Sequence, residues 1–261
     1  KWFLGILLSL CLLLTLLLYI FKDDIINYVV KEANKSLNAK VTVSKIDVTF
    51  WSSFPNLSVD FKNVYISDAF PGSDRKDTLL YSKLIRLKFN PMAAWNGDYS
   101  VKKVEIHPGK IFLKVNEKGE VNYNILKPSE NKEPSKFNLK LKKVELTDIH
   151  FVYSNLATGQ HYGTKIHNLD LRGEFTEKQF TLNAISKLHI DEIKSEKVTL
   201  LANKSAAFNL SIQVDQEKDI FEIPDATIFI SNLPFKLRGK IDPEKLRFDI
   251  SARQLKLEEV A

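Results

Sequence analysis

Apolar and polar residues alternate with a strict period of two through most of the chain after Lys40. A β-strand points successive side chains to opposite faces, so this period describes strands with one apolar and one polar face. The sequence therefore predicts a mainly β fold with a long antiparallel sheet. The apolar halves of the alternation fall at Val41–Val43, Ile46–Phe50, Leu57–Phe61, Val64–Ile66, Ile85–Phe89, Ile111–Val115, Phe137–Leu141, Val144–Leu146, Leu169–Leu171, Phe180–Leu182, Phe208–Val214, Ile228–Ile230, Phe235–Leu237, Leu246–Ile250 and Leu255–Leu257.

The alternation changes phase twice, between Phe61 and Val64 and between Leu141 and Val144. A change of phase within a strand is typical of a β-bulge or a bend, so we expect long strands to recurve at these points. Pro55 cannot donate a ladder hydrogen bond and is expected to end the pairing of "KIDVTF" with "LSVDF". The apolar faces need a cover, which is either a second sheet in a closed sandwich or a lipidic ligand held by a curled sheet.

An uncharged apolar run, Trp2–Phe21, precedes the strands. Its twenty residues would span about 30 Å as a helix, which matches the hydrocarbon core of a bilayer. Trp2 and Phe21 mark its ends, where aromatic rings favour the membrane interface. A cleavable signal peptide has a shorter apolar region that ends in small residues, and bulky Leu10 precedes Cys11, unlike in a lipoprotein cleavage site. The run predicts an uncleaved transmembrane anchor.

The rest of the chain divides into four predicted parts. Residues 22–40 have apolar residues at helical spacing, which predicts a short amphipathic helix on the core or at the membrane-proximal end of the sheet. Residues 41–126 form a first β unit, the polar segment 127–136 a linker, and residues 137–261 a second β unit. A weak repeat of "VKKVEIHPGKIFLKV" at Val101 as "LKKVELTDIHFVYS" at Leu141 suggests a sheet that grows by repetition. Because the chain ends within an alternating run, we expect it to be part of a longer protein.

The net charge of +6 raises the question of a nucleic-acid partner. The lysines of "FNLKLKKVEL", however, occupy the polar half of an alternation, and acidic residues share that half elsewhere. A nucleic-acid surface would gather cations into a patch with stacking aromatics. The pattern indicates a solvated strand face, with weak attraction to anionic lipid headgroups as the alternative. The single cysteine excludes a disulfide within the chain.

The sequence carries no recognisable catalytic pattern. The five histidines show no H-E-x-x-H spacing, and the chain has no glycine-rich phosphate loop and no G-x-S-x-G motif. His161 and His167 lie six residues apart across an expected turn and strand start, which favours loop chemistry over a zinc site. Acidic residues occur singly along polar faces. We therefore expect no enzymatic activity, no catalytic residues, no metal site and no cofactor.

Several segments together resemble the N-terminal region of the AsmA family. They are the apolar run, the segment "NKSLNAKVTVSKIDVTF", the pair "FPNLSVDFKNVYISD", and "DTLLYSKLIRLKFNPMAAWNGDYSVKKVEIHPGKIFLKV". In "NEKGEVNYNIL", Gly119 and the Asn122–Tyr123 pair match the family's Gly-x-x-Asn-aromatic turn. The resemblance is specific over residues 1–126 and extends to the rest only as a strand pattern.

The resemblance implies a single-pass inner-membrane protein of a Gram-negative bacterium, with its C-terminal bulk in the periplasm. Relatives are similar to TamB and to chorein-type bridge-like lipid-transfer proteins, whose sheets curl into an apolar, taco-like groove. The implied function is outer-membrane biogenesis by binding or conducting phospholipid, with periplasmic or outer-membrane proteins as further partners. Two alternatives remain open: an assembly factor that targets outer-membrane proteins without moving lipid, and an anchored enzyme whose active site lies in a further C-terminal part.

The residues expected to line such a groove come from the apolar halves of the first strands. A charge on this face, as in Val59→Asp or Leu87→Asp, is expected to abolish function, whereas Ser58→Asp on the polar face is expected to be harmless. The predicted lining consists of Val48, Phe50, Leu57, Val59, Phe61, Ile85, Leu87, Phe89, Ile111, Leu113 and Val115.

Overall fold

A computed structural model of the chain describes residues 37–49, 56–70, 77–90, 101–125, 141–175, 178–242 and 246–251. These residues form twelve strands in one sheet and contain no helix. The mainly β prediction is therefore confirmed. The strands are β1 (Val41–Thr42), β2 (Lys45–Thr49), β3 (Leu57–Ser67), β4 (Thr78–Phe89), β5 (Val101–Val115), β6 (Lys143–Asn155), β7 (Gln160–Arg172), β8 (Gln179–Ser195), β9 (Val198–Asp215), β10 (Ile220–Ile230), β11 (Leu233–Ile241) and β12 (Leu246–Ser251).

The strands follow one another across the sheet in chain order. β1 and β2 both pair with β3 and together act as one interrupted strand at its edge. Every neighbouring pair is antiparallel except β5 and β6, which run parallel. The predicted antiparallel sheet is thus right for all described pairs but this one, where a parallel contact joins two antiparallel parts.

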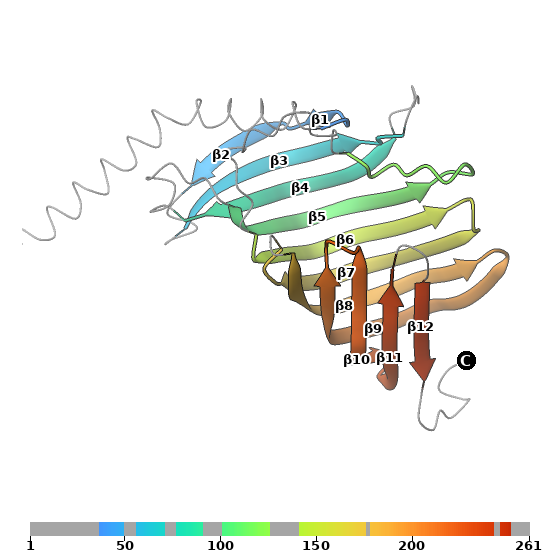
Figure 1. Ribbon diagram of the computed structural model, residues 1–261. Helices are drawn as coiled ribbons and strands as arrows, with labels where there is room; N and C mark the ends of the chain where they lie inside the picture. Colours follow the sequence, from blue (N-terminus) through green and yellow to red (C-terminus); the bar gives the residue numbers. More distant parts are fainter. Residues whose placement is uncertain are drawn as a thin grey trace, which may run out of the picture.

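The strands change direction toward the C-terminal end of the sheet (Figure 1). Strands β1 to β8 run roughly across the view, whereas β10 to β12 stand nearly upright. The sheet is not strongly curled, so the curled, taco-like groove that the resemblance implies is not seen in the described strands. All of these strands belong to one sheet, so two facing sheets of a closed sandwich are not seen among them either.

The parallel contact aligns the repeat that the sequence shows. Each residue of β5 lies beside the residue 40 positions later in β6, from the Lys103–Lys143 pair to the Val115–Asn155 pair. The "KVEI" of one copy therefore lies directly beside the "KVEL" of the other. The predicted linker at 127–136 lies outside the described residues. The strands before and after it, β5 and β6, pair with each other, so the two predicted β units form one sheet.

A line of irregular backbone crosses the sheet from β3 to β7, and we call it the crease. Asn63 and Asp148 have left-handed backbones there, with φ of 49° and 52°. Asn63 lies between Phe61 and Val64, where the sequence predicts a bulge or bend. The register of β3 with β4 does not shift there, so the irregularity is the left-handed backbone of Asn63 and not a β-bulge. The second predicted change, at Leu141 and Val144, falls where β6 begins, so the break in β6 lies at Asp148 instead. The registers align Asn63, Lys83, Pro108, Asp148 and His167 in the crease.

One further prediction is wrong, and two others concern segments that lie wholly or mostly outside the described residues. His161 and His167 both lie inside β7, so the turn predicted between them is wrong. The weak alternation of "QHYGTKIHNL" hid that strand in the sequence. The anchor with its ends Trp2 and Phe21, and residues 22–36 of the helix predicted over 22–40, fall outside the described residues. The described end of that prediction, residues 37–40, is not helical, so the prediction is wrong there. Within the described part, no helix is long and apolar enough to cross a membrane.

The crease yields a first testable prediction. Asn63 is exposed and left-handed, so its side chain contributes little packing while its backbone excludes β-branched residues. We expect Asn63→Val to lower the free energy of unfolding by about 1–2 kcal/mol. Asn63→Gly, which tolerates positive φ, should change it by less than about 0.5 kcal/mol. Urea denaturation of both variants tests this, and equal stability of the two would contradict it.

Candidate functional site

One face of the sheet is apolar along rows that run perpendicular to the strands, and we call it the apolar face. In the first row each residue is the register partner of the next. In the second row only Ser186 is polar. The first row runs Val48, Val59, Leu87, Val104, Val144, Leu171, Ala184 and Leu210. The second runs Ile46, Phe61, Ile85, Ile106, Leu146, Leu169, Ser186, Phe208, Ile228 and Phe235.

The apolar face packs into two clusters toward its two ends. The first centres on Val59, Phe89 and Val101, all of them buried. The second centres on Ala184, Leu210 and Ala226, with Phe208 and other half-buried side chains against it. The rows connect the clusters through Val104 and Val144 of the parallel pair, so the apolar face is continuous across the described sheet.

The structure brings most of the predicted lining residues together on this face. Val48, Leu57, Val59, Phe61, Leu87 and Phe89 belong to the first cluster, and Ile85 lies in the second row beside Phe61. Phe50 lies outside the described residues. Ile111, Leu113 and Val115 lie beyond the crease, at the other end of β5, and join different rows.

Sequence reasoning missed the middle and the far half of the apolar face. Val104 and Ile106 precede the crease on β5, whereas the prediction chose the apolar residues that follow it. The same alternation in Val144–Leu146, Leu169–Leu171 and Phe208–Ile212 carried the missing signal. The 40-residue repeat would have linked them, because it is the register of the parallel strands.

Beyond the crease, one row contains aromatic residues. Leu113, Tyr153, Tyr162, Ile193 and Leu201 are successive register partners from β5 to β9. The rings of Tyr153 and Tyr162 stack with centroids 5.4 Å apart. Burial raises the pKa of Tyr162, and its neighbour Tyr153 raises it further. This row therefore combines one stacked tyrosine pair with three aliphatic residues.

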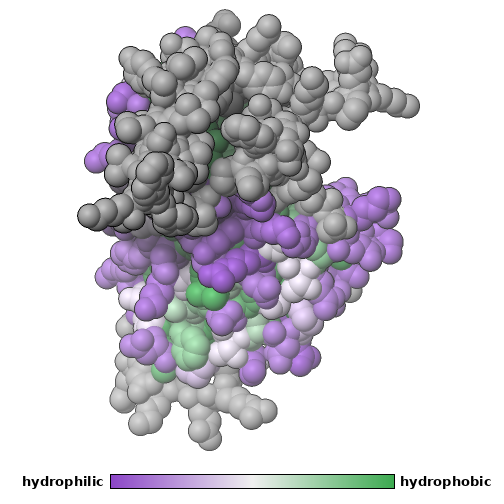
Figure 2. All heavy atoms as spheres, turned by 90° about the vertical axis from the view of Figure 1, so that its left-hand side faces the viewer, coloured by the Kyte–Doolittle hydropathy of each residue, from purple (hydrophilic) through white to green (hydrophobic). Residues whose placement is uncertain are grey.

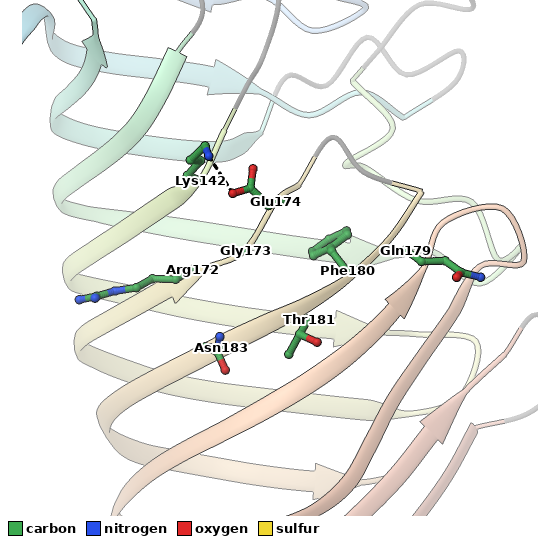
Figure 3. A pocket seen from close by; sticks show the side chains of 8 residues that line it. All are labelled: Lys142, Arg172, Gly173, Glu174, Gln179, Phe180, Thr181 and Asn183. Carbon is green, nitrogen blue, oxygen red and sulfur yellow. Dashed lines mark hydrogen bonds and ion pairs between the residues drawn. The ribbon is translucent and has the colours of Figure 1, made fainter.

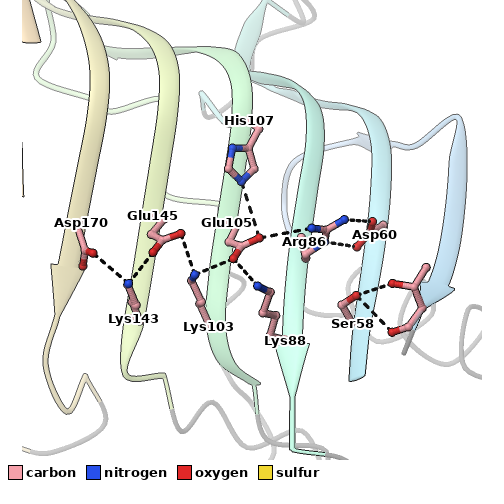
Figure 4. Close-up of polar contacts among 11 residues, drawn as sticks. Ser58, Asp60, Arg86, Lys88, Lys103, Glu105, His107, Lys143, Glu145 and Asp170 are labelled. Carbon is pink, nitrogen blue, oxygen red and sulfur yellow. Dashed lines mark hydrogen bonds and ion pairs between the residues drawn. The ribbon is translucent and has the colours of Figure 1, made fainter. Parts of the chain in front are cut away.

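The opposite face carries a continuous network of ion pairs across β3 to β7, which we call the charge ladder (Figure 4). Acidic and basic side chains alternate from Asp60 to Arg172, and Lys88 joins this series as a branch at Glu105. The side chains of Asp60 and Glu105 are only 8% and 7% exposed. The ladder consists of Asp60, Arg86, Lys88, Glu105, Lys103, Glu145, Lys143, Asp170 and Arg172.

The geometry of the ladder is tight at its centre. Arg86 donates to both carboxylate oxygens of Asp60, from Nε at 2.7 Å and from Nη2 at 2.6 Å. Glu105 accepts from Lys88 and Lys103 at 2.7 Å each. Lys103 also reaches Glu145 at 2.8 Å and so spans the parallel contact. Buried charges are tolerated only when paired in this way.

The ladder lowers the pKa of Glu105, Glu145 and Asp170. Burial alone would raise the pKa of Glu105, but hydrogen bonds from Lys103 and Lys88 outweigh burial and lower the pKa to about 2. The hydrogen bond from Arg172 lowers the pKa of Asp170 to about 2, with Lys143 contributing in the same direction. Both groups are therefore ionised at neutral pH and act as fixed structural charges.

Ser58 lies on the polar face, as predicted, but the expectation that Ser58→Asp is harmless does not fit the structure. Its side chain is fully buried, and its hydroxyl lies 2.7 Å from the Thr49 hydroxyl. A carboxylate at this position would be desolvated beside Asp60, two residues along the same strand. A harmless control substitution must therefore come from an exposed position.

The Gly119–Asn122–Tyr123 turn is held by one buried amide. Asn122 is fully buried; its Oδ1 accepts from the Lys114 backbone N–H at 2.8 Å. Its Nδ2 donates to the Asp68 carboxylate and to the Phe112 carbonyl at 2.9 Å each. Asn122 therefore ties the turn after β5 to the end of β3, and Gly119 supplies a φ of 82° before it.

A shallow recess of about 450 Å³ opens where β7 ends and β8 begins. Phe180 lies in it between the Lys142–Glu174 ion pair and the side chains of Thr181 and Asn183 (Figure 3). The Lys142 Nζ and Glu174 Oε1 atoms are 2.8 Å apart. This is the strand-end edge that faces the viewer in Figure 2, where hydrophobic patches reach the surface between hydrophilic ones. The recess thus combines an exposed ion pair with an aromatic floor.

The described residues hold no group of three histidine, cysteine, aspartate or glutamate side chains able to bind a metal ion. Comparison of the chain with protein-family models, with curated proteins and with solved structures finds no match.

The charge ladder predicts a pH-dependent stability. Because the pKa values of Glu105 and Asp170 are lowered in the folded state, the folded protein binds protons less readily than the unfolded chain. The stabilisation is complete above about pH 4.5, and it is lost as the pH falls from there toward 2. We expect the free energy of unfolding to drop by about 1–3 kcal/mol between pH 6 and pH 3, measured by urea denaturation. Glu105→Gln should reduce that drop, and an unchanged drop would contradict the prediction.

Asn122 yields a further prediction. Asn122→Ala removes three hydrogen bonds and leaves buried partners unsatisfied, so we expect the free energy of unfolding to fall by about 2–4 kcal/mol. Asn124→Ala is the matched control, because Asn124 is exposed two residues along the same turn, and its change should stay within about 0.5 kcal/mol. Thermal and urea denaturation measure both. Similar values for the two variants would exclude the tying role of Asn122.

Proposed function

We propose that this protein binds phospholipid acyl chains on its apolar face and belongs to the AsmA-like proteins that support outer-membrane biogenesis. The observation that carries the proposal is the continuity of the apolar rows from β2 to β9 in a single sheet. Among the described strands, no second sheet covers this face. The ladder on the opposite face pairs its own charges and leaves the apolar face as the side suited to a lipid.

The dimensions of the apolar face suit an acyl chain. Neighbouring strands lie about 4.8 Å apart, so the eight positions of the first row extend over about 34 Å. Each methylene removed from water contributes about 0.8 kcal/mol, so a continuous apolar surface lowers the cost of holding a lipid outside a bilayer. This function requires no catalytic residue, cofactor or metal.

The resemblance supplies the proposed cellular setting. The run Trp2–Phe21 would anchor the chain in the inner membrane of a Gram-negative bacterium, with the strands in the periplasm. The sheet would then take phospholipid near the membrane and pass it along the apolar face toward the outer membrane. Periplasmic or outer-membrane proteins are the proposed partners at the far end.

Two adjacent positions on β9 test the function. Phe208 is half-buried on the apolar face, whereas Asn209 is exposed on the polar face. We expect Phe208→Asp to reduce co-purifying phospholipid at least tenfold, because a charge would be desolvated under an acyl chain. Asn209→Asp adds the same charge one residue away and should leave the lipid content unchanged. The measurement is lipid extraction and mass spectrometry of the full chain purified in dodecyl maltoside.

A variant without the charge distinguishes loss of lipid binding from loss of the folded structure. Phe208→Ala should keep the circular-dichroism spectrum of the sheet and still lower the lipid content, because it removes apolar contact area. Wild-type protein that carries no phospholipid, or equal lipid content in the Phe208→Asp and Asn209→Asp variants, would overturn the proposal. In that case an assembly factor that pairs client strands with a sheet edge becomes the better explanation.

A further inference from the structure

The recess at the end of β7 is built from groups of complementary charge around an aromatic ring. Lys142 contributes an ammonium group, Glu174 a carboxylate and Phe180 its ring (Figure 3). The Lys142 and Glu174 side chains are 56% and 53% exposed. An ion pair this exposed contributes at most about 1 kcal/mol, so a ligand that offers both charges can open it at little cost.

The backbone at Gly173 lies close to the Phe180 ring, and both residues line the recess. A Cβ atom added at Gly173 would lie 2.9 Å from the Thr181 carbonyl oxygen and 3.1 Å from the Phe180 ring. A side chain at this position would therefore press on the floor of the recess. The Phe175 ring lies next to the Phe180 ring, with centroids 5.7 Å apart. Glycine at 173 and phenylalanine at 175 and 180 together shape the recess.

Phe180 connects the recess to the apolar face. Phe180 is the register partner of Val214, which is the partner of Phe221 on β10. One position further into the sheet on the same face, Leu182 pairs with Ile212, beside the Ala184–Leu210 pair of the first row. A molecule whose apolar part lies on the apolar face can therefore place a polar end in the recess.

These observations together point to one class of ligand end. We infer that the recess receives the zwitterionic headgroup of a phospholipid whose acyl chains lie on the apolar face, and this inference rests on the proposed function. The phosphate pairs with the Lys142 ammonium, and the amine of the headgroup pairs with the Glu174 carboxylate. The same amine lies over the Phe180 ring, whose face attracts cations.

The test compares two lipids that share their acyl chains. Dioleoylphosphatidylethanolamine carries both headgroup charges, whereas dioleoylglycerol carries neither. Native mass spectrometry of the full chain in dodecyl maltoside, titrated with each lipid, gives the two affinities. The double variant Lys142→Gln with Glu174→Gln is expected to bind phosphatidylethanolamine about tenfold more weakly and dioleoylglycerol as the wild type does.

A second exposed ion pair provides the matched control. Lys178 and Glu217 pair near the same strand-end edge, with side chains 78% and 56% exposed, and neither lines the recess. Lys178→Gln with Glu217→Gln should leave both affinities unchanged. Circular dichroism of the three proteins shows whether the sheet is intact, and we expect it to be, because both ion pairs are exposed.

The outcomes separate the two proposals. If the Lys142 and Glu174 double variant binds both lipids as the wild type does, the headgroup site is overturned while lipid binding on the apolar face stands. If the control pair weakens phosphatidylethanolamine binding equally, the effect is one of general charge and the site is also overturned. If the wild type binds neither lipid, the proposed function itself fails.

Discussion

The in-register parallel contact between β5 and β6 aligns the two antiparallel parts of the described sheet. Every other pair of neighbouring strands in the described part is antiparallel. The register at each pair fixes which side chains of the next strand lie on which face. A slip of one residue at the parallel contact would turn Val144 and Leu146 to the charged face and Lys143 and Glu145 to the apolar face, because side chains alternate with a period of two. The constant offset of 40 residues therefore keeps the apolar rows of β2–β5 and β6–β11 in line.

The two faces reinforce the same register for different physical reasons. On one side, Val104 packs beside Val144 and Ile106 beside Leu146, so apolar surface is buried only in the correct alignment. On the other side, Lys103 bridges Glu105 of its own strand and Glu145 of the next. In register, Lys103 lies beside Lys143 and Glu105 beside Glu145, so like charges are neighbours across the parallel contact. The ladder offsets their repulsion because Lys103 contacts Glu105 and Glu145, and Lys143 contacts Glu145 and Asp170. This explains why lysine and glutamate are both repeated in the two copies.

The alternation in the sequence was enough to predict a mainly β chain and most of the apolar face from Val48 to Phe89, but it missed the part of β7 that holds His161 and His167. It could not predict the parallel contact, because parallel and antiparallel strands with one wet face have the same period. The only sign of this pairing in the sequence is the repeat of "KVEI" as "KVEL". The two segments lie 40 residues apart, so the repeat alone does not show that they are neighbours in the sheet. The charge ladder was hidden for a related reason: Asp60, Arg86, Glu105 and Asp170 each look like isolated solvated residues until four strands place them in one row. The crease was partly visible as a change of phase at Asn63, while Asp148 and His167 lay in stretches with weaker alternation.

A closed sandwich and a single open sheet can be written with the same alternation, and the strand order decides between them for the described residues. In a sandwich the strands divide between two sheets that face each other, and each sheet supplies the cover of the other. Here β1 to β12 form one sheet in chain order, so the described strands do not cover their own apolar face. Burying a face of this extent requires material of matching length and low polarity, and an acyl chain meets both conditions without a defined partner sequence. The exposed Lys142–Glu174 pair above the Phe180 ring then places opposite charges at the edge where such a chain would end, as a zwitterionic amphiphile requires.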